Sequence, residues 1–235
     1  MSSRVKSKQA NRIVREQLAA EQRRRRTIVV SIVAAAVLLL AGLVGIGIYV
    51  NQKPAANSAV PAGTTSDHTG IQISSGPVPM DIYIDYLCPN CKRFEDGAQS
   101  TLDDLATKKK ISLVYHPIAI LDHSTNPPGY STRAGSAAGC ASDAGKFAEY
   151  TRALFAQQPA EGSAGLTDDQ LVQIGSGIGL TDPGFGQCVR AEKYADWMAH
   201  NTDAAAAKNI NGTPTVLVNG KPVSPTVDAI LKAVG

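Results

Sequence analysis

Two cysteines separated by two residues, Cys88-Pro89-Asn90-Cys91, have the clearest capacity for chemistry in this chain. They follow an alternating, strand-favouring run, residues 79–86, and precede a helix-compatible run, residues 92–107. A thiol at the start of a helix lies over free backbone N–H groups, which stabilise a thiolate. We therefore predict that Cys88 is a nucleophile and that Cys91, one turn into the helix, is a more covered resolving thiol.

Cysteine pairs with this spacing also occur in zinc sites and in purely structural disulfides. A structural zinc site needs four ligands, and the chain has no second CxxC motif. The other cysteines, Cys140 and Cys188, and the histidines lack metal-ligand spacing. A structural Cys88–Cys91 bridge would close too short a loop to restrain the unfolded chain. Redox chemistry is favoured, and no metal or cofactor is expected.

The flanking sequence predicts an α/β domain that begins near Ile71. A β-α-β unit is expected first, with strands near 71–73, 79–86 and 111–116 around the helix at 92–107. Residues 123–207 read as a helical insert, with helices near 130–142, 143–157, 167–177 and 183–207. A strand at 215–218, the hairpin turn Asn219-Gly220, a partner strand from Lys221 and a closing helix at 225–234 complete a β-β-α unit.

The part of the chain before this domain has a different composition. Residues 1–26 carry nine Lys/Arg and two Glu, a net charge of +7, whereas residues 51–235 carry 14 basic and 18 acidic residues, a net charge of −4. Residues 27–50 lack charge and, as a helix, would span ~36 Å, enough to cross a membrane. Basic residues remain on the cytoplasmic side, so we predict an inside tail and an outside body. Residues 51–70 are expected to form a flexible linker.

Thr213-Pro214 opens the returning strand after Asn211-Gly212 and is a candidate for a cis peptide bond, although an ordinary trans loop proline remains an alternative. Together with the CPNC motif at 88–91 and the interposed helical block, it makes residues 71–235 resemble DsbA-like proteins of the thioredoxin superfamily. The whole chain resembles their membrane-anchored actinobacterial form. The resemblance implies a thioredoxin fold in which Thr213 and cis-Pro214, with Pro89 and Asn90, contact the substrate.

The same resemblance implies a second, structural disulfide between Cys140 and Cys188. Two free buried thiols or a second redox pair remain alternatives for these residues. Two departures from the family pattern stand out: Asn90 occupies a position where many DsbA proteins have His, and Ile82 replaces the buried acid of thioredoxins. Asp85 is expected to be exposed or to cap the chain rather than to act in catalysis.

The resemblance implies an extracytoplasmic thiol:disulfide oxidoreductase in the cell membrane that introduces disulfides into exported proteins. The implied partners are cysteine-containing client proteins and a quinone-linked VKOR-type membrane enzyme that reoxidises the protein. A monomer that binds no nucleic acid is expected. Two alternatives remain: a reductase or isomerase of the same fold, and a non-enzymatic membrane-anchored binding or chaperone module.

Overall fold

The computed structural model describes residues 59–235. The predicted basic tail (1–26), the predicted membrane segment (27–50) and most of the predicted linker lie outside the described residues. Between residues 59 and 235, no helix has both the length and the apolar character needed to span a membrane.

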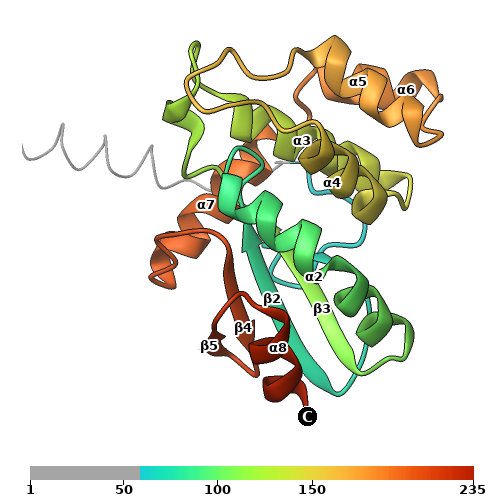
Figure 1. The fold of residues 1–235 in the computed structure, drawn as a ribbon. Helices are drawn as coiled ribbons and strands as arrows, with labels where there is room; N and C mark the ends of the chain where they lie inside the picture. The colour runs from blue at the N-terminus through green and yellow to red at the C-terminus, as the bar shows by residue number, and fades with distance from the viewer. Residues whose placement is uncertain (1–58) are drawn as a thin grey trace, which may run out of the picture. The chain divides into compact units, whose positions relative to one another are not determined.

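The described residues contain a five-stranded mixed sheet with the strand order β1-β3-β2-β4-β5 (Figure 1). Strands β2 and β3 are parallel, whereas β1 pairs antiparallel with β3, β4 with β2, and β5 with β4. The strands are β1 (Ile71–Gln72), β2 (Val78–Ile84), β3 (Ile111–Pro117), β4 (Thr215–Val218) and β5 (Lys221–Val223). The predicted β-α-β and β-β-α units are therefore confirmed, and together they form one sheet.

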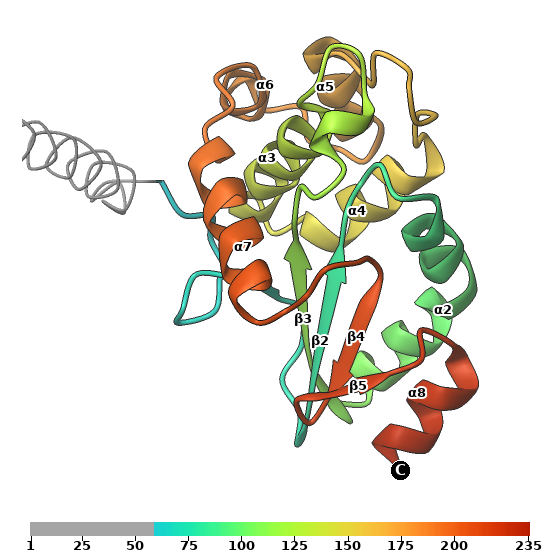
Figure 2. The ribbon, with the colours of Figure 1, turned by 90° about the vertical axis from the view of Figure 1, so that its left-hand side faces the viewer.

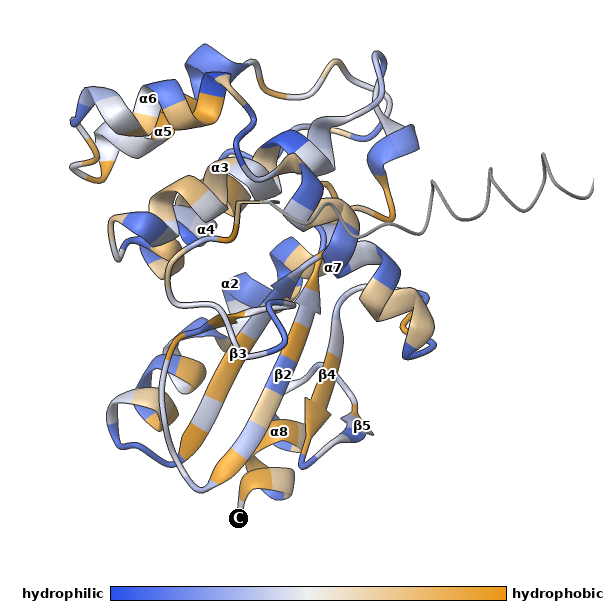
Figure 3. Cartoon of the chain, turned by 180° about the vertical axis from the view of Figure 1, so that it is seen from behind, coloured by the Kyte–Doolittle hydropathy of each residue, from blue (hydrophilic) through white to orange (hydrophobic). Residues whose placement is uncertain are grey.

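Helices cover both faces of this sheet (Figure 2). Helices α2 (Pro89–Thr107) and α8 (Val227–Val234) lie on one face, and α7 (Ala195–Ala207) lies on the other. Strand β2 has buried side chains on both faces: Met80, Ile82 and Ile84 on one, and Tyr83, which packs in a cluster with Ala205 of α7, on the other. Figure 3 shows hydrophobic colour concentrated along β3 and β4, as expected for strands covered on both sides.

The helical insert lies between β3 and β4 and contains one helix more than predicted. Besides α7, it comprises α3 (Tyr130–Asp143), α4 (Phe147–Ala156), α5 (Asp168–Gly177) and α6 (Pro183–Arg190), after a short 3₁₀ turn at Asp122–Ser124. The predicted long helix over 183–207 is wrong, because the chain leaves helical geometry between α6 and α7. Glu192 has a φ of 44°, in the left-handed region that interrupts a right-handed helix.

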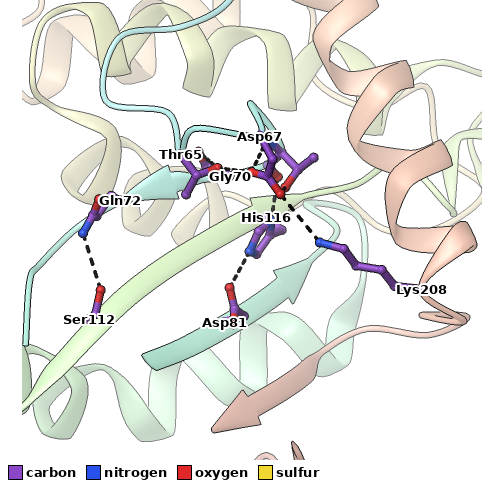
Figure 4. Close-up of polar contacts among 9 residues, drawn as sticks. Thr65, Asp67, Gly70, Gln72, Asp81, Ser112, His116 and Lys208 are labelled. Carbon is purple, nitrogen blue, oxygen red and sulfur yellow. Dashed lines mark hydrogen bonds and ion pairs between the residues drawn. The ribbon is translucent and has the colours of Figure 1, made fainter. Parts of the chain in front are cut away.

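The expected linker reaches Gly70, yet residues 59–70 pack on the domain as an N-terminal segment. The indole N–H of Trp197 donates to the His68 carbonyl at 2.7 Å. The ring nitrogens of His116 lie 2.6 Å from the Thr69 carbonyl and 2.9 Å from Asp81 Oδ1 (Figure 4). These polar contacts hold a segment whose composition offers little apolar surface, which explains why composition alone predicts a linker there.

Candidate active site

The Cys88–Cys91 motif lies where the chain passes from β2 into α2. The backbone N–H of Cys88 donates to the Asp85 carbonyl at 3.0 Å, which closes a tight turn after the strand. Cys88 is the N-cap of α2 in extended geometry, and Pro89 occupies the first helical position, where its missing N–H costs nothing. The predicted placement of Cys88 at the helix start is therefore observed.

The two thiols have opposite electrostatic environments. The pKa of Cys88 is lowered to about 5. The hydrogen bond from the Cys91 side chain is the largest cause, the backbone N–H groups of Cys91 and Asn90 act in the same direction, and burial opposes them. Burial, the hydrogen bond to Cys88 and the charge of Cys88 raise the pKa of the fully buried Cys91 thiol far above its usual range. The site can therefore hold a thiolate at Cys88 and a neutral thiol at Cys91 at neutral pH.

The loop before β4 forms the opposite side of the site. The Thr213–Pro214 peptide bond is cis. The Cys88 sulfur lies 3.3 Å from the Thr213 carbonyl oxygen, although 125 residues separate them in the chain. An open groove of about 380 Å³ runs beside this contact and is lined by Asn90, Arg93, Phe94, Thr213, Pro214 and Pro225. Of the four residues predicted to contact the substrate, Asn90, Thr213 and Pro214 line this groove, and Pro89 precedes Asn90 in the chain.

Asn90 contributes to the site through its backbone. Its N–H is among the groups that lower the pKa of Cys88, whereas its exposed side chain accepts a hydrogen bond from Arg93. The side chain that replaces the family's His is therefore directed at a neighbouring guanidinium.

Cys140 and Cys188 form a disulfide, which is the pairing that the resemblance implies. The bond joins α3 to α6 with a Cα–Cα distance of 5.9 Å, a normal value for a disulfide. In the described part of the chain, no group of three or more His, Cys, Asp or Glu side chains has the arrangement of a metal site.

Gln158 and Lys92, through which the insert holds the active-site turn, were not predicted from the sequence. Gln158, just after α4, donates from Nε2 to the carbonyls of Tyr86 and Cys88, at 3.0 Å each. Lys92 in α2 donates to the Phe155 carbonyl of α4 at 2.9 Å. No motif marks Gln158, because its partners are backbone carbonyls about 70 residues away.

Asp85 and Glu95 are buried carboxyl groups close to the motif. Of the two alternatives expected for Asp85, exposure or capping, exposure is wrong, because its side chain is fully buried. Its capping role is observed: the Leu87 N–H donates to Asp85 Oδ1 at 2.9 Å. An Asp side chain commonly accepts from the backbone N–H two residues further on, in an Asx turn. Glu95, one helical turn after Cys91, is 4% exposed, and burial raises its pKa to about 7.

Known proteins resemble this chain over the described domain. A thioredoxin family model matches residues 71–234. The reduced disulfide bond oxidoreductase DsbG of Mycobacterium tuberculosis is 29% identical, with a TM-score of 0.60, over 73% of this chain and 84% of that one. Oxidised DsbA from the same organism is also 29% identical, with a TM-score of 0.59, over 73% of this chain and 88% of that one.

A curated relative is much longer than the matching segment. The serine/threonine-protein kinase PknE of Mycobacterium tuberculosis is 29% identical over 168 residues, which are 67% of this chain and 30% of the kinase. The chain therefore spans less than a third of this relative. The family model, by contrast, covers the whole sheet and insert. On that coverage, the chain belongs to the thioredoxin family, and its structural neighbours are thiol-disulfide oxidoreductases of the DsbA and DsbG type.

Proposed function

We propose that this protein is a thiol-disulfide oxidase that introduces disulfides into exported proteins. The observation that carries the proposal is the position of the Cys88 sulfur, at the N-terminus of α2 and 3.3 Å from the Thr213 carbonyl that precedes Pro214; this environment lowers the pKa of Cys88 to about 5. Stabilising the reduced thiolate makes the corresponding disulfide easier to reduce and therefore a stronger oxidant. A reductase would need a less stable thiolate in its reduced form, because its disulfide is then harder to reduce.

The proposed exchange proceeds through a mixed disulfide. A client thiolate attacks the Cys88 sulfur of the Cys88–Cys91 disulfide, and Cys91 leaves and takes up a proton. A second client thiolate then attacks the client sulfur and displaces Cys88 as a thiolate. Overall, a client dithiol becomes a disulfide, and the protein gains two electrons and one proton while a second proton enters solvent. The groove beside Thr213 and Pro214 gives the client peptide a surface next to Cys88.

The proposal includes an extracytoplasmic location, supported by the charge-free segment 27–50 after a tail of net charge +7. Reoxidation by a quinone-linked VKOR-type membrane enzyme would return Cys88 and Cys91 to the disulfide. A reporter fused after residue 235 tests the orientation: alkaline phosphatase, active only outside the cytosol, should be active in this fusion. An inactive phosphatase in an intact fusion contradicts the location.

Oxidation of reduced, unfolded ribonuclease by the disulfide form tests the activity. The wild-type protein should restore ribonuclease activity, whereas Cys88→Ser and Cys91→Ser, neither of which can form the active disulfide, should not. With a client that already contains a disulfide, the Cys88 thiolate of Cys91→Ser should attack that bond and accumulate as a mixed disulfide while a client thiolate leaves. The matched control replaces both Cys140 and Cys188 with Ala and keeps the CxxC motif. If Cys88→Ser oxidises the client as fast as wild type, the oxidase proposal fails; if the reduced form instead reduces insulin efficiently, the reductase alternative replaces it.

A further inference from the structure

The side chain of Asp85 connects the active-site turn to the helical insert. Its carboxylate accepts three hydrogen bonds: Oδ1 from the Leu87 N–H at 2.9 Å and from the Ser131 hydroxyl at 2.6 Å, and Oδ2 from the Leu121 N–H at 2.9 Å. The donors come from the turn itself, from helix α3 and from the β3–α3 connection. One buried carboxylate thus joins the active-site turn to two positions 36 and 46 residues further along the chain.

This carboxylate is stabilised by neutral donors alone. No Lys, Arg or His within residues 59–235 forms an ion pair with Asp85. Burial raises the pKa of Asp85 to about 6, even though the hydrogen bond from Ser131 and those from the Leu121 and Leu87 amides act in the opposite direction. The group can therefore change its charge in a mildly acidic medium.

Two other titratable groups face Asp85. Cys88 belongs to the same tight turn, since its N–H donates to the Asp85 carbonyl, and a charge on Cys88 raises the pKa of Asp85. Tyr130 approaches from α3, and the Asp85 charge adds to the effect of burial in raising the pKa of that phenol. Because repulsion between charges is mutual, an ionised Asp85 also opposes the Cys88 thiolate.

We propose that Asp85 is a positioning residue that holds the active-site turn against the insert and, through its negative charge, limits the stability of the Cys88 thiolate. The inference rests on the proposed thiol–disulfide exchange. When the Cys88–Cys91 disulfide accepts two electrons from a dithiol, one proton of that dithiol goes to Cys91. At neutral pH the other proton goes to solvent, and the charge of Asp85 then opposes the new Cys88 thiolate, which restrains the oxidising strength of the protein. In a mildly acidic medium Asp85 can take up this proton, which removes the repulsion.

Asp85→Asn tests the charge and keeps the shape. The amide oxygen can still accept from Leu87 and Ser131, while the charge and the acceptor of the Leu121 N–H are lost. At pH 7, where Asp85 is ionised, the glutathione ratio that half-reduces the CxxC should shift by about threefold to tenfold toward a stronger oxidant. The shift should vanish near pH 5, where the wild-type Asp85 is already neutral. Equilibration with glutathione at both pH values, read by alkylation and mass spectrometry, measures the effect. Asp122→Asn is the matched control, because Asp122 accepts two hydrogen bonds from Thr132 outside the turn.

The direction of the change separates this role from a merely structural one. A loosened turn would weaken the stabilisation of the Cys88 thiolate and make the protein a weaker oxidant, so an opposite shift or no shift of the glutathione ratio at pH 7 in folded Asp85→Asn contradicts the proposal. If Asp85→Asn does not fold, Ser131→Ala removes one donor, raises the pH at which Asp85 is neutralised, and should give a smaller shift of the same sign near pH 6. A wild-type protein that does not exchange with glutathione would contradict the proposed function itself.

Discussion

Cys88 and Cys91 are separated by a single turn of helix, yet their surroundings drive their ionisation in opposite directions. Cys88 is the N-cap residue of α2, where the Cys91 side chain and nearby backbone N–H groups lower its pKa, whereas Cys91 is fully buried. In the proposed exchange, this difference suits Cys88 to be the sulfur that a client thiolate attacks and that later leaves as a thiolate, while Cys91 takes up a proton.

The pH dependence of Cys88 alkylation should reveal its stabilised thiolate. Half-maximal reactivity is expected near pH 5, compared with an ordinary pKa of 9.0. Because the folded pKa is the lower one, the thiolate contributes to the stability of the reduced protein fully above about pH 9. Between about pH 9 and about pH 5 this contribution falls by about 1.4 kcal/mol per pH unit, and below about pH 5 it is absent. Urea unfolding of reduced wild type and of Cys88→Ser measures it; equal pH profiles would refute the assignment.

Two substitutions at Asn90 separate the effect of its backbone N–H on the ionisation of Cys88 from the effect of its side chain. Asn90→Ala keeps the N–H that faces Cys88 and should leave the pH of Cys88 ionisation nearly unchanged. Asn90→Pro removes that N–H at a first-turn position that tolerates proline, so Cys88 should ionise at higher pH. Alkylation kinetics of both folded variants provide the measurement. A large effect of Asn90→Ala with none of Asn90→Pro would show that the side chain matters instead.

The active-site turn is held by elements on both sides of it. Helix α2 begins at the motif, while the insert supplies Gln158 and the Phe155 carbonyl from the end of α4. The Tyr86 hydroxyl also pairs with Thr151 of α4 at 2.9 Å. The insert is therefore part of the support of the active site as well as a cover for the sheet.

Replacing Gln158 should weaken this support. Gln158→Leu leaves the Tyr86 carbonyl without its Gln158 donor and should lower the free energy of unfolding by about 1–3 kcal/mol. Urea unfolding measures the change. Gln157→Leu is the matched control, because Gln157 is exposed and adjacent. Equal losses in the two variants would argue that Gln158 does not hold the turn.

The Cys140–Cys188 disulfide joins α3 to α6 across a sequence separation of 48 residues. Replacing both cysteines with Ala should lower the free energy of unfolding by ~4 kcal/mol through the greater freedom of the unfolded chain. The ionisation of Cys88 should not change, since the bridge lies outside the active-site turn. Alkylation of the denatured, unreduced protein is the direct check, and labelling of both residues would contradict the bridge.

Across the whole molecule, short sequence patterns predict the strands, helix starts and turns whose geometry depends on neighbouring residues. Alternation along β2, Pro89 after Cys88 and Asn219-Gly220 each specify a neighbouring geometry, and all three are observed. The burial of Asp85 and the contacts of Gln158 depend on the position of the insert, which no short pattern encodes. The N-terminal segment 59–70 could not be separated from a linker, because the residues that hold it are distant in the sequence.

The equilibrium between the Cys88–Cys91 pair and glutathione tests the oxidase assignment most directly. A reduction potential near about −120 mV is expected, because the folded protein stabilises the Cys88 thiolate of its reduced form. The measurement needs no knowledge of the clients, and the protein lacking Cys140 and Cys188 can be titrated alongside as a control. A potential near about −270 mV, typical of a thioredoxin-like reductant, would contradict the oxidase assignment.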